Sequence, residues 1–283
     1  MFVFKAAVVG AGTMGWGIAH VIASADIPVV LKDVDQESVD RGIENARSLW
    51  QAQVDAGKLD AAELQRKLAL ITGATDYANF GDVDLAIEAV PERMEIKQAV
   101  FSELDAVTPG HAILASNTSS LSITEMGEAT GRPDQVVGLH FFYPVSVARA
   151  VEVVEGEDTS AETAQVAANF AQAIRKLPIR CAEAPGFVVN RILNAAVSEL
   201  WRFQEETGTE VKAVDSLVAG SPGSPAGPFR VADLLGLDTV AAVAEHLNES
   251  YGDRFYVHQG MRELVARGDL GAKTGKGFYE HGS

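Results

Sequence analysis

The chain of 283 residues is 47% hydrophobic and 22% charged, and its formal net charge is −16 at pH 7. These proportions are typical of a soluble globular protein large enough for two domains. A surface this acidic repels nucleic acid and anionic membranes, although backbone amides still bind a small phosphate group. The single cysteine, Cys181, excludes an internal disulfide and favours a reducing, cytoplasmic compartment without a structural metal. No signal peptide or membrane span is expected.

Short apolar segments alternate with helix-like segments through the first 180 residues. Strands are predicted over residues 3–9, 28–33, 84–90, 112–116, 136–142 and 150–154. Helices are predicted over residues 13–25, 36–56, 61–70, 94–107 and 161–176. This alternation predicts βαβ units in a mostly parallel sheet, which is the α/β, Rossmann-type class.

The pattern changes after Pro185, where apolar residues recur at helical spacing. Pro185 is expected in the first turn of a helix, because its missing N–H costs nothing there. Further helices are predicted over residues 211–218, 231–235, 239–247 and 261–266, and three prolines predict a loop over residues 220–228. We therefore expect an α/β domain of residues 1–182 and an all-helical domain of residues 183–283.

The first predicted strand runs into Gly10-Ala11-Gly12-Thr13-Met14-Gly15, and a helix follows. In a dinucleotide-binding turn the first glycine allows the tight turn, the second lets the backbone approach a pyrophosphate, and the third lets the helix pack on the strand. Asp33 ends the second predicted strand, where a carboxylate accepts hydrogen bonds from the adenosine ribose and repels a 2′-phosphate. The motif predicts NAD rather than NADP, although Lys32 weakens that preference. An ordinary tight turn beside a surface acid is the alternative.

His140 ends one predicted strand, and Glu152 interrupts another strand that is otherwise apolar. An acid inside an apolar strand is costly unless it is paired. Histidine titrates near neutrality, and a carboxylate on its other ring nitrogen fixes the tautomer and stabilises the imidazolium. A His140–Glu152 pair explains both residues and indicates acid/base chemistry at the carboxyl end of the sheet. A histidine satisfied in the core and a solvent-facing Glu152 are the alternatives.

Five further segments accompany these features along the chain. They are Ser116-Asn117-Thr118-Ser119-Ser120, Gly138-Leu139-His140-Phe141-Phe142, Val151-Glu152-Val153, Pro185-Gly186-Phe187-Val188-Val189-Asn190-Arg191 and Lys273-Thr274-Gly275-Lys276-Gly277-Phe278-Tyr279. With the glycine motif, they resemble the 3-hydroxyacyl-CoA dehydrogenase family, including 3-hydroxybutyryl-CoA dehydrogenases, over nearly the whole chain. The resemblance implies reversible, NAD-dependent oxidation of an (S)-3-hydroxyacyl-CoA to a 3-oxoacyl-CoA, as in fatty acid β-oxidation.

The resemblance also implies roles for the polar residues of these segments. It makes His140 the general acid/base and Glu152 its orienting partner. It makes Ser119 and Asn190 the groups that hold the substrate's 3-oxygen, and Asn117 a residue that supports this cluster near the nicotinamide. The plainer interpretation has Ser119 and Asn117 capping a helix that begins near residue 121. Asn190 is expected mid-helix, where asparagine is mildly unfavourable.

Cofactor and CoA contacts are implied in the same way. Glu92 and Lys97 match family positions near the nicotinamide ribose. The expected cofactor set is Gly10, Gly12, Thr13, Met14, Gly15, Asp33, Glu92, Lys97 and Asn117. The helical pair of residues 36–70 matches the part that clasps the CoA arm, and Lys58 is the candidate phosphate contact there, with Arg66 and Lys67 nearby. Solvated charges on an exposed helix are the alternative.

Two departures from the family pattern concern the place where substrate and cofactor meet. Tyr143 stands where the family usually has asparagine, and residues 221–226 carry additional serine, glycine and proline. Because of these departures, a second function remains possible: a dehydrogenase of a small free hydroxy acid or sugar acid on the same fold. A non-catalytic NAD-binding structural or sensor protein is the third possibility. The family and the apolar helical half predict a homodimer through the second domain.

Overall fold

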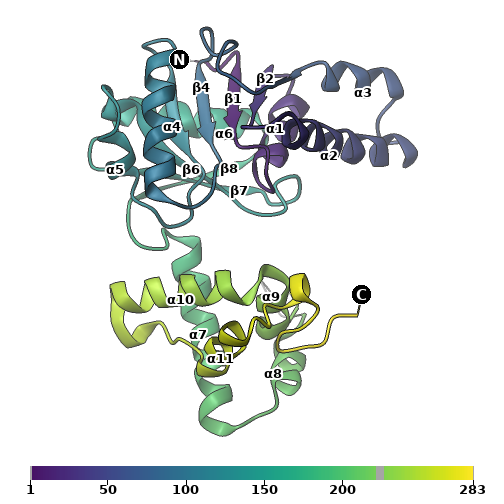
Figure 1. The fold of residues 1–283 in the computed structure, drawn as a ribbon, viewed down its shortest axis with the longest axis vertical. Coiled ribbons are helices and arrows are strands. Elements are labelled where there is room, and N and C mark those ends of the chain that lie inside the picture. Colours follow the sequence, from purple (N-terminus) through teal and green to yellow (C-terminus); the bar gives the residue numbers. More distant parts are fainter. Residues whose placement is uncertain (1, 221–225, 283) are drawn as a thin grey trace. The chain divides into compact units, whose positions relative to one another are not determined.

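The computed structural model describes residues 2–220 and 226–282. Contacts within the chain divide it into two compact units, Met1–Glu183 and Ala184–Ser283. The first unit is a sheet with helices against it, and the second is built of helices (Figure 1). Each unit is described by itself below.

The first unit contains an eight-stranded sheet in the order β3-β2-β1-β4-β5-β6-β7-β8. The strands are β1 (Ala6–Val9), β2 (Val29–Lys32), β3 (Ile71–Ala74), β4 (Leu85–Glu88), β5 (Ile113–Ser116), β6 (Val136–Phe141), β7 (Ala150–Glu155) and β8 (Leu177–Ala182). Of the neighbouring pairs only β6 and β7 are antiparallel. The predicted α/β class with a mostly parallel sheet is confirmed. Its central strands are buried, apolar and rich in β-branched residues, as parallel strands covered on both faces require.

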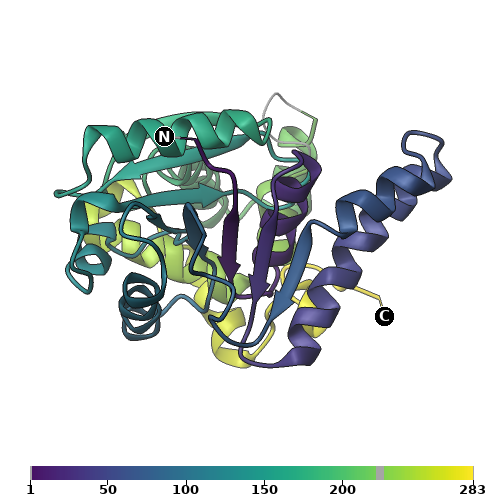
Figure 2. The ribbon, with the colours of Figure 1, turned by 90° about the horizontal axis from the view of Figure 1, so that it is seen from above.

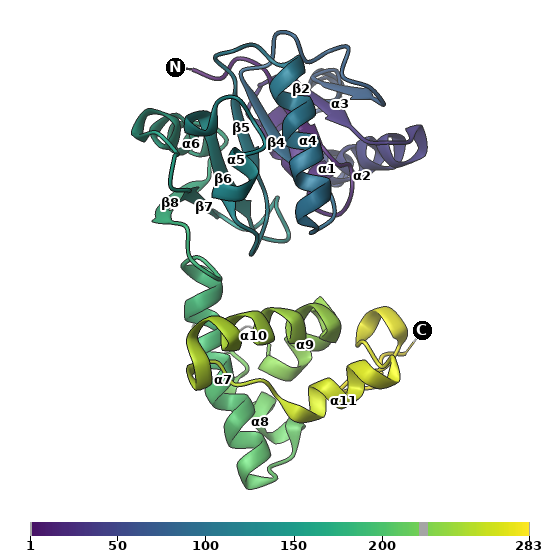
Figure 3. The ribbon, with the colours of Figure 1, turned by 60° about the vertical axis from the view of Figure 1, so that its left-hand side comes forward.

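Helices cover both faces of this sheet. They are α1 (Gly15–Ser24), α2 (Gln36–Asp55), α3 (Ala61–Leu68), α4 (Met94–Val107), α5 (Ile123–Gly127) and α6 (Ala161–Ala173). Figure 2 shows α4 and α6 on opposite sides of the strands, and Figure 3 shows α4 and α5 on the same side. The large core lies on the α1, α2 and α6 side. The other face, under α4 and α5, carries the polar side chains described below.

Two strands were not predicted, and both lie at the edges of the sheet. β3 reads Ile-Thr-Gly-Ala with its two middle residues exposed, and β8 contains a proline and has no fully buried residue. Edge strands bury little apolar surface, so the periodic signal that identifies central strands is weak there. Residues 61–70 were predicted as one helix, whereas α3 ends at Leu68 and β3 follows almost at once.

The second unit comprises α7 (Val189–Thr207), α8 (Val211–Val218), α9 (Pro228–Leu235), α10 (Leu237–Tyr251) and α11 (Gln259–Arg267) among its described residues. The prediction that Pro185 opens a helix is wrong. A turn precedes α7, with Gly186 at φ +73° and Phe187 at φ +45°. Of the loop that departs from the family pattern, residues 221–225 lie outside the described residues. Within residues 2–220 and 226–282, no helix has the length and apolar character needed to cross a membrane.

The C-terminal motif of residues 273–279 is held by a buried carboxylate. Asp233 on α9 is fully buried and accepts hydrogen bonds from the backbone N–H groups of Phe278 and Tyr279, each at 2.9 Å. A Cβ at Gly277 would lie 2.2 Å from Asp233 Oδ1, so only glycine allows this approach. Asp215 on α8 binds the Tyr279 hydroxyl at 2.7 Å. These contacts show that the motif holds the C-terminal segment against α8 and α9.

His20 is a buried histidine on α1. Its ring stacks on Trp50 with 4.6 Å between centroids, and neither ring nitrogen has a hydrogen bond in the described part of the chain. Burial, assisted by the charges of Lys176 and Lys67, lowers the pKa of His20 from 6.5 to about 4. The unfolded chain therefore takes up this proton first as the pH falls.

We expect the native protein to lose stability through His20 as the pH falls from 6.5 toward 4, by up to about 3 kcal/mol. His20→Phe keeps an aromatic ring against Trp50 and removes the titration. Urea unfolding at pH 7, 6 and 5 should show a smaller decline of the unfolding free energy in the variant than in the original protein. Parallel declines in the two proteins would contradict this assignment.

Candidate active site

The glycine-rich turn connects β1 to α1. Gly10 has φ +102°, and a Cβ there would lie 2.5 Å from the carbonyl oxygen of Ala89. A Cβ on Gly15 would lie 1.7 Å from the carbonyl oxygen of Gly10, so the helix touches the turn. At Gly12, by contrast, a Cβ would meet nothing within 4 Å. Open space thus borders the backbone where a pyrophosphate is expected, and the α1 N-cap, Met14, supplies no side-chain hydrogen bond to compete with it.

Asp33 lies beside this turn at the end of β2. Its carboxylate accepts hydrogen bonds from the backbone N–H of Ala11 at 2.6 Å and of Val34 at 2.7 Å. Lys32 points elsewhere, because neighbouring residues of a strand face opposite sides of the sheet. Its ammonium lies 4.4 Å from the centroid of the Tyr77 ring, and the side chain is buried. The residue that weakened the preference for NAD therefore does not offer its charge beside Asp33.

His140 and Glu152 face each other across the antiparallel pair β6–β7, where the register places them directly opposite. His140 Nδ1 lies 2.7 Å from Glu152 Oε2, and the Glu152 side chain is 0% exposed. The alternative of a solvent-facing Glu152 is wrong. When Nδ1–H donates to this carboxylate, Nε2 is the basic nitrogen of the neutral imidazole. The arrangement suits a general base whose charged form is stabilised by a buried anion.

The loop after β5 carries Asn117 and Ser119. Asn117 Oδ1 accepts a hydrogen bond from the backbone N–H of Phe141 at 2.9 Å, which ties this loop to the strand end that bears His140. The Ser119 hydroxyl makes no hydrogen bond with any described residue. Neither side chain caps the following helix: α5 begins at Ile123, and Ser122 caps it by accepting from the Glu125 N–H at 3.1 Å. The capping interpretation of Asn117 and Ser119 is therefore wrong.

Glu92 and Lys97 form an ion pair, with Lys97 Nζ 3.1 Å from Glu92 Oε2. Glu92 Oε1 also accepts from the Thr118 hydroxyl at 2.6 Å and from the Ser119 N–H at 2.9 Å. Burial raises the pKa of Glu92, but Lys97 and these two donors together bring it below its usual value. The Lys97 side chain is 1% exposed and its ammonium also binds Glu88. Lys97 therefore lies between the two carboxylates of Glu88 and Glu92, and its contact with the nicotinamide ribose stays a prediction.

Glu88 and Ser116 were missed by the sequence reasoning. Glu88 ends β4, lies opposite Ser116 of β5 in register, and accepts a hydrogen bond from the Ser116 hydroxyl at 2.6 Å. The signal was available, because Glu88 is an acid at the end of an apolar strand, as unusual as Glu152 in its own strand.

Asn190 is the second residue of α7, in its first turn, and not mid-helix as expected. Asparagine is well tolerated at a helix start, so its helical position carries no signal of function. Asn190 belongs to the second unit. Its backbone carbonyl accepts a hydrogen bond from Asn194 Nδ2 at 2.9 Å.

The three cations expected near the CoA arm differ in their surroundings. Lys58 is exposed in the turn after α2. Arg66 lies 2.9 Å from Asp26 and 2.6 Å from Glu63. Lys67 is buried beside the same two acids. Lys58 is therefore the better candidate for a phosphate contact, because Arg66 and Lys67 are already paired with acids. Tyr143, which departs from the family pattern, lies just after β6 and is exposed.

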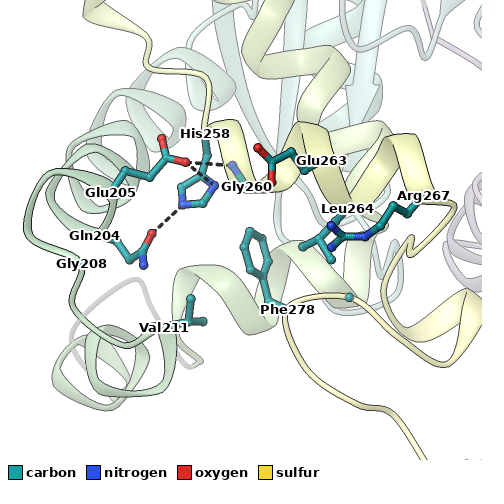
Figure 4. A pocket seen from close by; sticks show the side chains of 11 residues that line it. Gln204, Glu205, Gly208, Val211, His258, Gly260, Glu263, Leu264, Arg267 and Phe278 are labelled. Carbon is teal, nitrogen blue, oxygen red and sulfur yellow. Dashed lines mark hydrogen bonds and ion pairs between the residues drawn. The ribbon is translucent and has the colours of Figure 1, made fainter.

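A pocket of about 460 Å³ lies wholly within the second unit (Figure 4). His258 projects into it and donates from Nε2 to Gln204 Oε1 at 2.8 Å, while its Nδ1 accepts from the Met261 N–H at 3.0 Å. Glu205 accepts from the backbone N–H of Gly260 at 2.8 Å (Figure 4). No residue predicted for catalysis, cofactor or substrate lines this pocket.

Comparison with known proteins agrees with this geometry. The family model described as 3-hydroxyacyl-CoA dehydrogenase, NAD binding domain, matches residues 5–184, and that of the C-terminal domain matches residues 186–281. A probable 3-hydroxybutyryl-CoA dehydrogenase of Deinococcus radiodurans is 40% identical over 98% of this chain and 100% of that protein. The 3-hydroxybutyryl-CoA dehydrogenase of Clostridioides difficile is 38% identical over 98% of this chain and 99% of that protein.

Solved structures give the same result. The crystal structure of (S)-3-hydroxybutyryl-CoA dehydrogenase from Ralstonia eutropha matches with a TM-score of 0.94 at 36% identity, covering 99% of this chain and 100% of that one. The resemblance noted in the sequence and the expectation of NAD are both confirmed. The chain therefore belongs to the 3-hydroxyacyl-CoA dehydrogenase family and, like its members, is an NAD-dependent oxidoreductase.

Proposed function

We propose that the enzyme interconverts (S)-3-hydroxyacyl-CoA and 3-oxoacyl-CoA thioesters with short acyl chains, with His140 as the acid/base. The observation that carries this proposal is the buried 2.7 Å contact between His140 Nδ1 and Glu152 Oε2 at the carboxyl end of β6. The names of the relatives, which specify 3-hydroxybutyryl-CoA, support a short acyl chain. Such a reaction fits fatty acid β-oxidation.

In the oxidation direction, His140 Nε2 takes the proton of the 3-hydroxyl while the electrons of the C3–H bond leave as hydride. NAD, when held at the glycine-rich turn, would supply the acceptor for that hydride. Glu152 holds the imidazole in the tautomer that presents a basic Nε2, and its charge stabilises the imidazolium that forms. In the reverse direction the imidazolium returns the proton to the 3-oxygen.

The remaining roles are those that the glycine motif and the family resemblance imply, and the positions of the polar groups support them. The Ser119 hydroxyl donates to the substrate 3-oxygen, and the same role for Asn190 rests on the sequence motif alone. The turn at Gly12 receives the pyrophosphate, with Thr13 and Met14 at the start of α1 contributing backbone N–H groups. Asp33 binds the adenosine ribose, Glu92 binds the nicotinamide ribose, and Lys58 meets a phosphate of CoA.

The helical unit is proposed as the substrate-binding and dimerisation domain of a homodimer. Its exposed large apolar side chains support this: Ile192, Leu193, Phe203, Leu217, Leu234 and Leu235. Such side chains are the usual core of a dimer interface. The single cysteine supports a cytoplasmic location, and the net charge of −16 disfavours nucleic acid and anionic membranes as partners.

The first test is NADH consumption with acetoacetyl-CoA. Free acetoacetate is the control, because a diketoreductase structure matches this chain at 29% identity and a TM-score of 0.84, and its description names dicarbonyl compounds as substrates. We expect efficient turnover of the thioester and little of the free acid. Faster turnover of free acetoacetate would favour the alternative of a small free acid substrate.

His140 and Glu152 should act as one unit. We expect His140→Gln to reduce kcat by about 10²- to 10⁴-fold, since it removes the acid/base. Glu152→Gln should also reduce kcat strongly, because the imidazolium loses its counter-charge. The double variant should be little slower than His140→Gln alone. Fully additive losses, measured with NADH binding intact in each variant, would mean that Glu152 does not act through His140.

Asp33 should set the preference for NAD. We expect the original enzyme to have a much higher kcat/KM with NAD than with NADP, because a carboxylate repels a 2′-phosphate. Asp33→Ala should narrow that difference, mainly by raising KM for NAD. Comparing kcat/KM for the two cofactors in both proteins checks this. Equal efficiency with NAD and NADP before any substitution would refute the role of Asp33.

Light scattering at micromolar concentration should report about twice the chain mass of 30.0 kDa. Leu234→Glu combined with Leu235→Glu should shift the mass toward that of one chain, because charge then replaces apolar contact in the interface. Val34→Glu is the matched control, since Val34 is an even more exposed apolar residue, on the first unit. A monomer at every accessible concentration would contradict the homodimer.

A further inference from the structure

A second buried acid, Glu88, lies on the same sheet face as the His140–Glu152 pair. It ends β4, its side chain is 0% exposed, and α4 lies over that strand. Parallel strands end at one edge of a sheet, so the end of β4 adjoins the loops where a Rossmann-type domain binds its ligands. Glu88 has no part in the proton and hydride transfers proposed for the reaction.

Both oxygens of Glu88 are used. Oε1 accepts from Lys97 Nζ at 2.7 Å and from the backbone N–H of Val90 at 2.7 Å. Oε2 accepts from the Ser116 hydroxyl at 2.6 Å. Charge-assisted hydrogen bonds of this kind are shorter and stronger than neutral ones, so they fix the geometry of their partners closely.

Two chains of contacts run outward from Glu88 to the same loop. In the first, Lys97 reaches Glu92 Oε2 at 3.1 Å, and Glu92 Oε1 binds the Ser119 N–H at 2.9 Å. In the second, the Ser116 oxygen accepts from the Thr118 N–H at 3.1 Å. The Thr118 hydroxyl closes the ring by donating to Glu92 Oε1 at 2.6 Å. Both chains of contacts therefore start at one buried carboxylate and end at Glu92 and Ser119.

Stability alone is a poor explanation for this network. Replacing a buried ion pair by apolar side chains of similar volume is often neutral or stabilising, whereas removing one partner is costly. What an apolar pair does not provide is a fixed direction for the Glu92 carboxylate and for the backbone of Ser119. A displacement of about 1 Å at such groups costs up to about 10²-fold in rate.

We propose that Glu88 is a positioning residue of this dehydrogenase: through Lys97 and Ser116 it holds Glu92 and Ser119 in the arrangement that serves cofactor and substrate. The inference rests on the roles proposed above for Glu92 and Ser119. It concerns residues that are closed to bulk solvent, since Lys97 is 1% exposed and Ser116 is buried.

The test uses the full-length enzyme and the variants Glu88→Gln, Lys97→Met and their combination. Each single variant leaves a buried charge short of a partner, so each should lower the melting temperature. The combination removes both buried charges and leaves only Glu92, whose side chain is 41% exposed and can be solvated by water, so its melting temperature should largely recover. Its kcat with acetoacetyl-CoA should nevertheless stay about 10- to 100-fold low, and NADH, followed by its fluorescence, should bind several-fold more weakly.

Arg132→Met is the matched control, because Arg132 is also a largely buried cation paired with an acid, Asp105 at 2.8 Å, away from these loops. It should lower the melting temperature and leave kcat and NADH affinity unchanged. Recovery of kcat and NADH affinity together with the melting temperature in the double variant would overturn the inference, since the pair would then serve only the fold. Absence of acetoacetyl-CoA turnover in the unmodified enzyme would instead refute the proposed function.

Discussion

A buried carboxylate has to be paired, and this constraint organises one face of the sheet. Glu88 and Glu152 are both fully buried on the side covered by α4 and α5. Glu88 ends β4, and Glu152 lies opposite His140 near the end of β6. Glu88 is paired with Lys97, and Glu152 is paired with His140. The two partners differ in their proposed tasks: His140 is proposed as the acid/base, whereas Lys97 also contacts Glu92 and is proposed to hold its loop in place.

The glycine-rich turn has the opposite requirement: its backbone must stay exposed so that a pyrophosphate can approach it. A Cβ at Gly10 or Gly15 would collide with neighbouring backbone, whereas one at Gly12 would enter open space. The turn is thus packed against neighbouring backbone at Gly10 and Gly15 and open at Gly12. Asp33 completes it by accepting the Ala11 N–H, so the residue proposed to select NAD also holds the turn in shape. Parallel strands bring both requirements to the same edge of the sheet.

The sequence predicted features that depend on local pattern and missed those that depend on neighbours. The bounds of α4 and α8 were predicted to the residue, because the apolar spacing that marks them is a local pattern. β3 and β8 escaped notice, since edge strands carry little apolar signal. The pairing of His140 with Glu152 could be predicted, because an acid in an apolar strand needs a partner. The burial of the Lys97 side chain could not be predicted, because its partner Glu88 lies on β4 whereas Lys97 lies on α4.

Burial of an acid does not by itself indicate function, and the helical unit shows why. Asp233 is as deeply buried as Glu152, and it also contacts an imidazole, with His281 Nε2 2.8 Å from its Oδ2. Asp233 in addition accepts hydrogen bonds from the backbone N–H groups of residues 278 and 279, so it holds the C-terminal segment against α9. The imidazole that faces Glu152 stands on the neighbouring strand β6, whose end is tied by Asn117 to the loop after β5. The place of the histidine partner in the fold, and not the depth of the carboxylate, therefore distinguishes the acid proposed for catalysis from the acid that holds a chain segment.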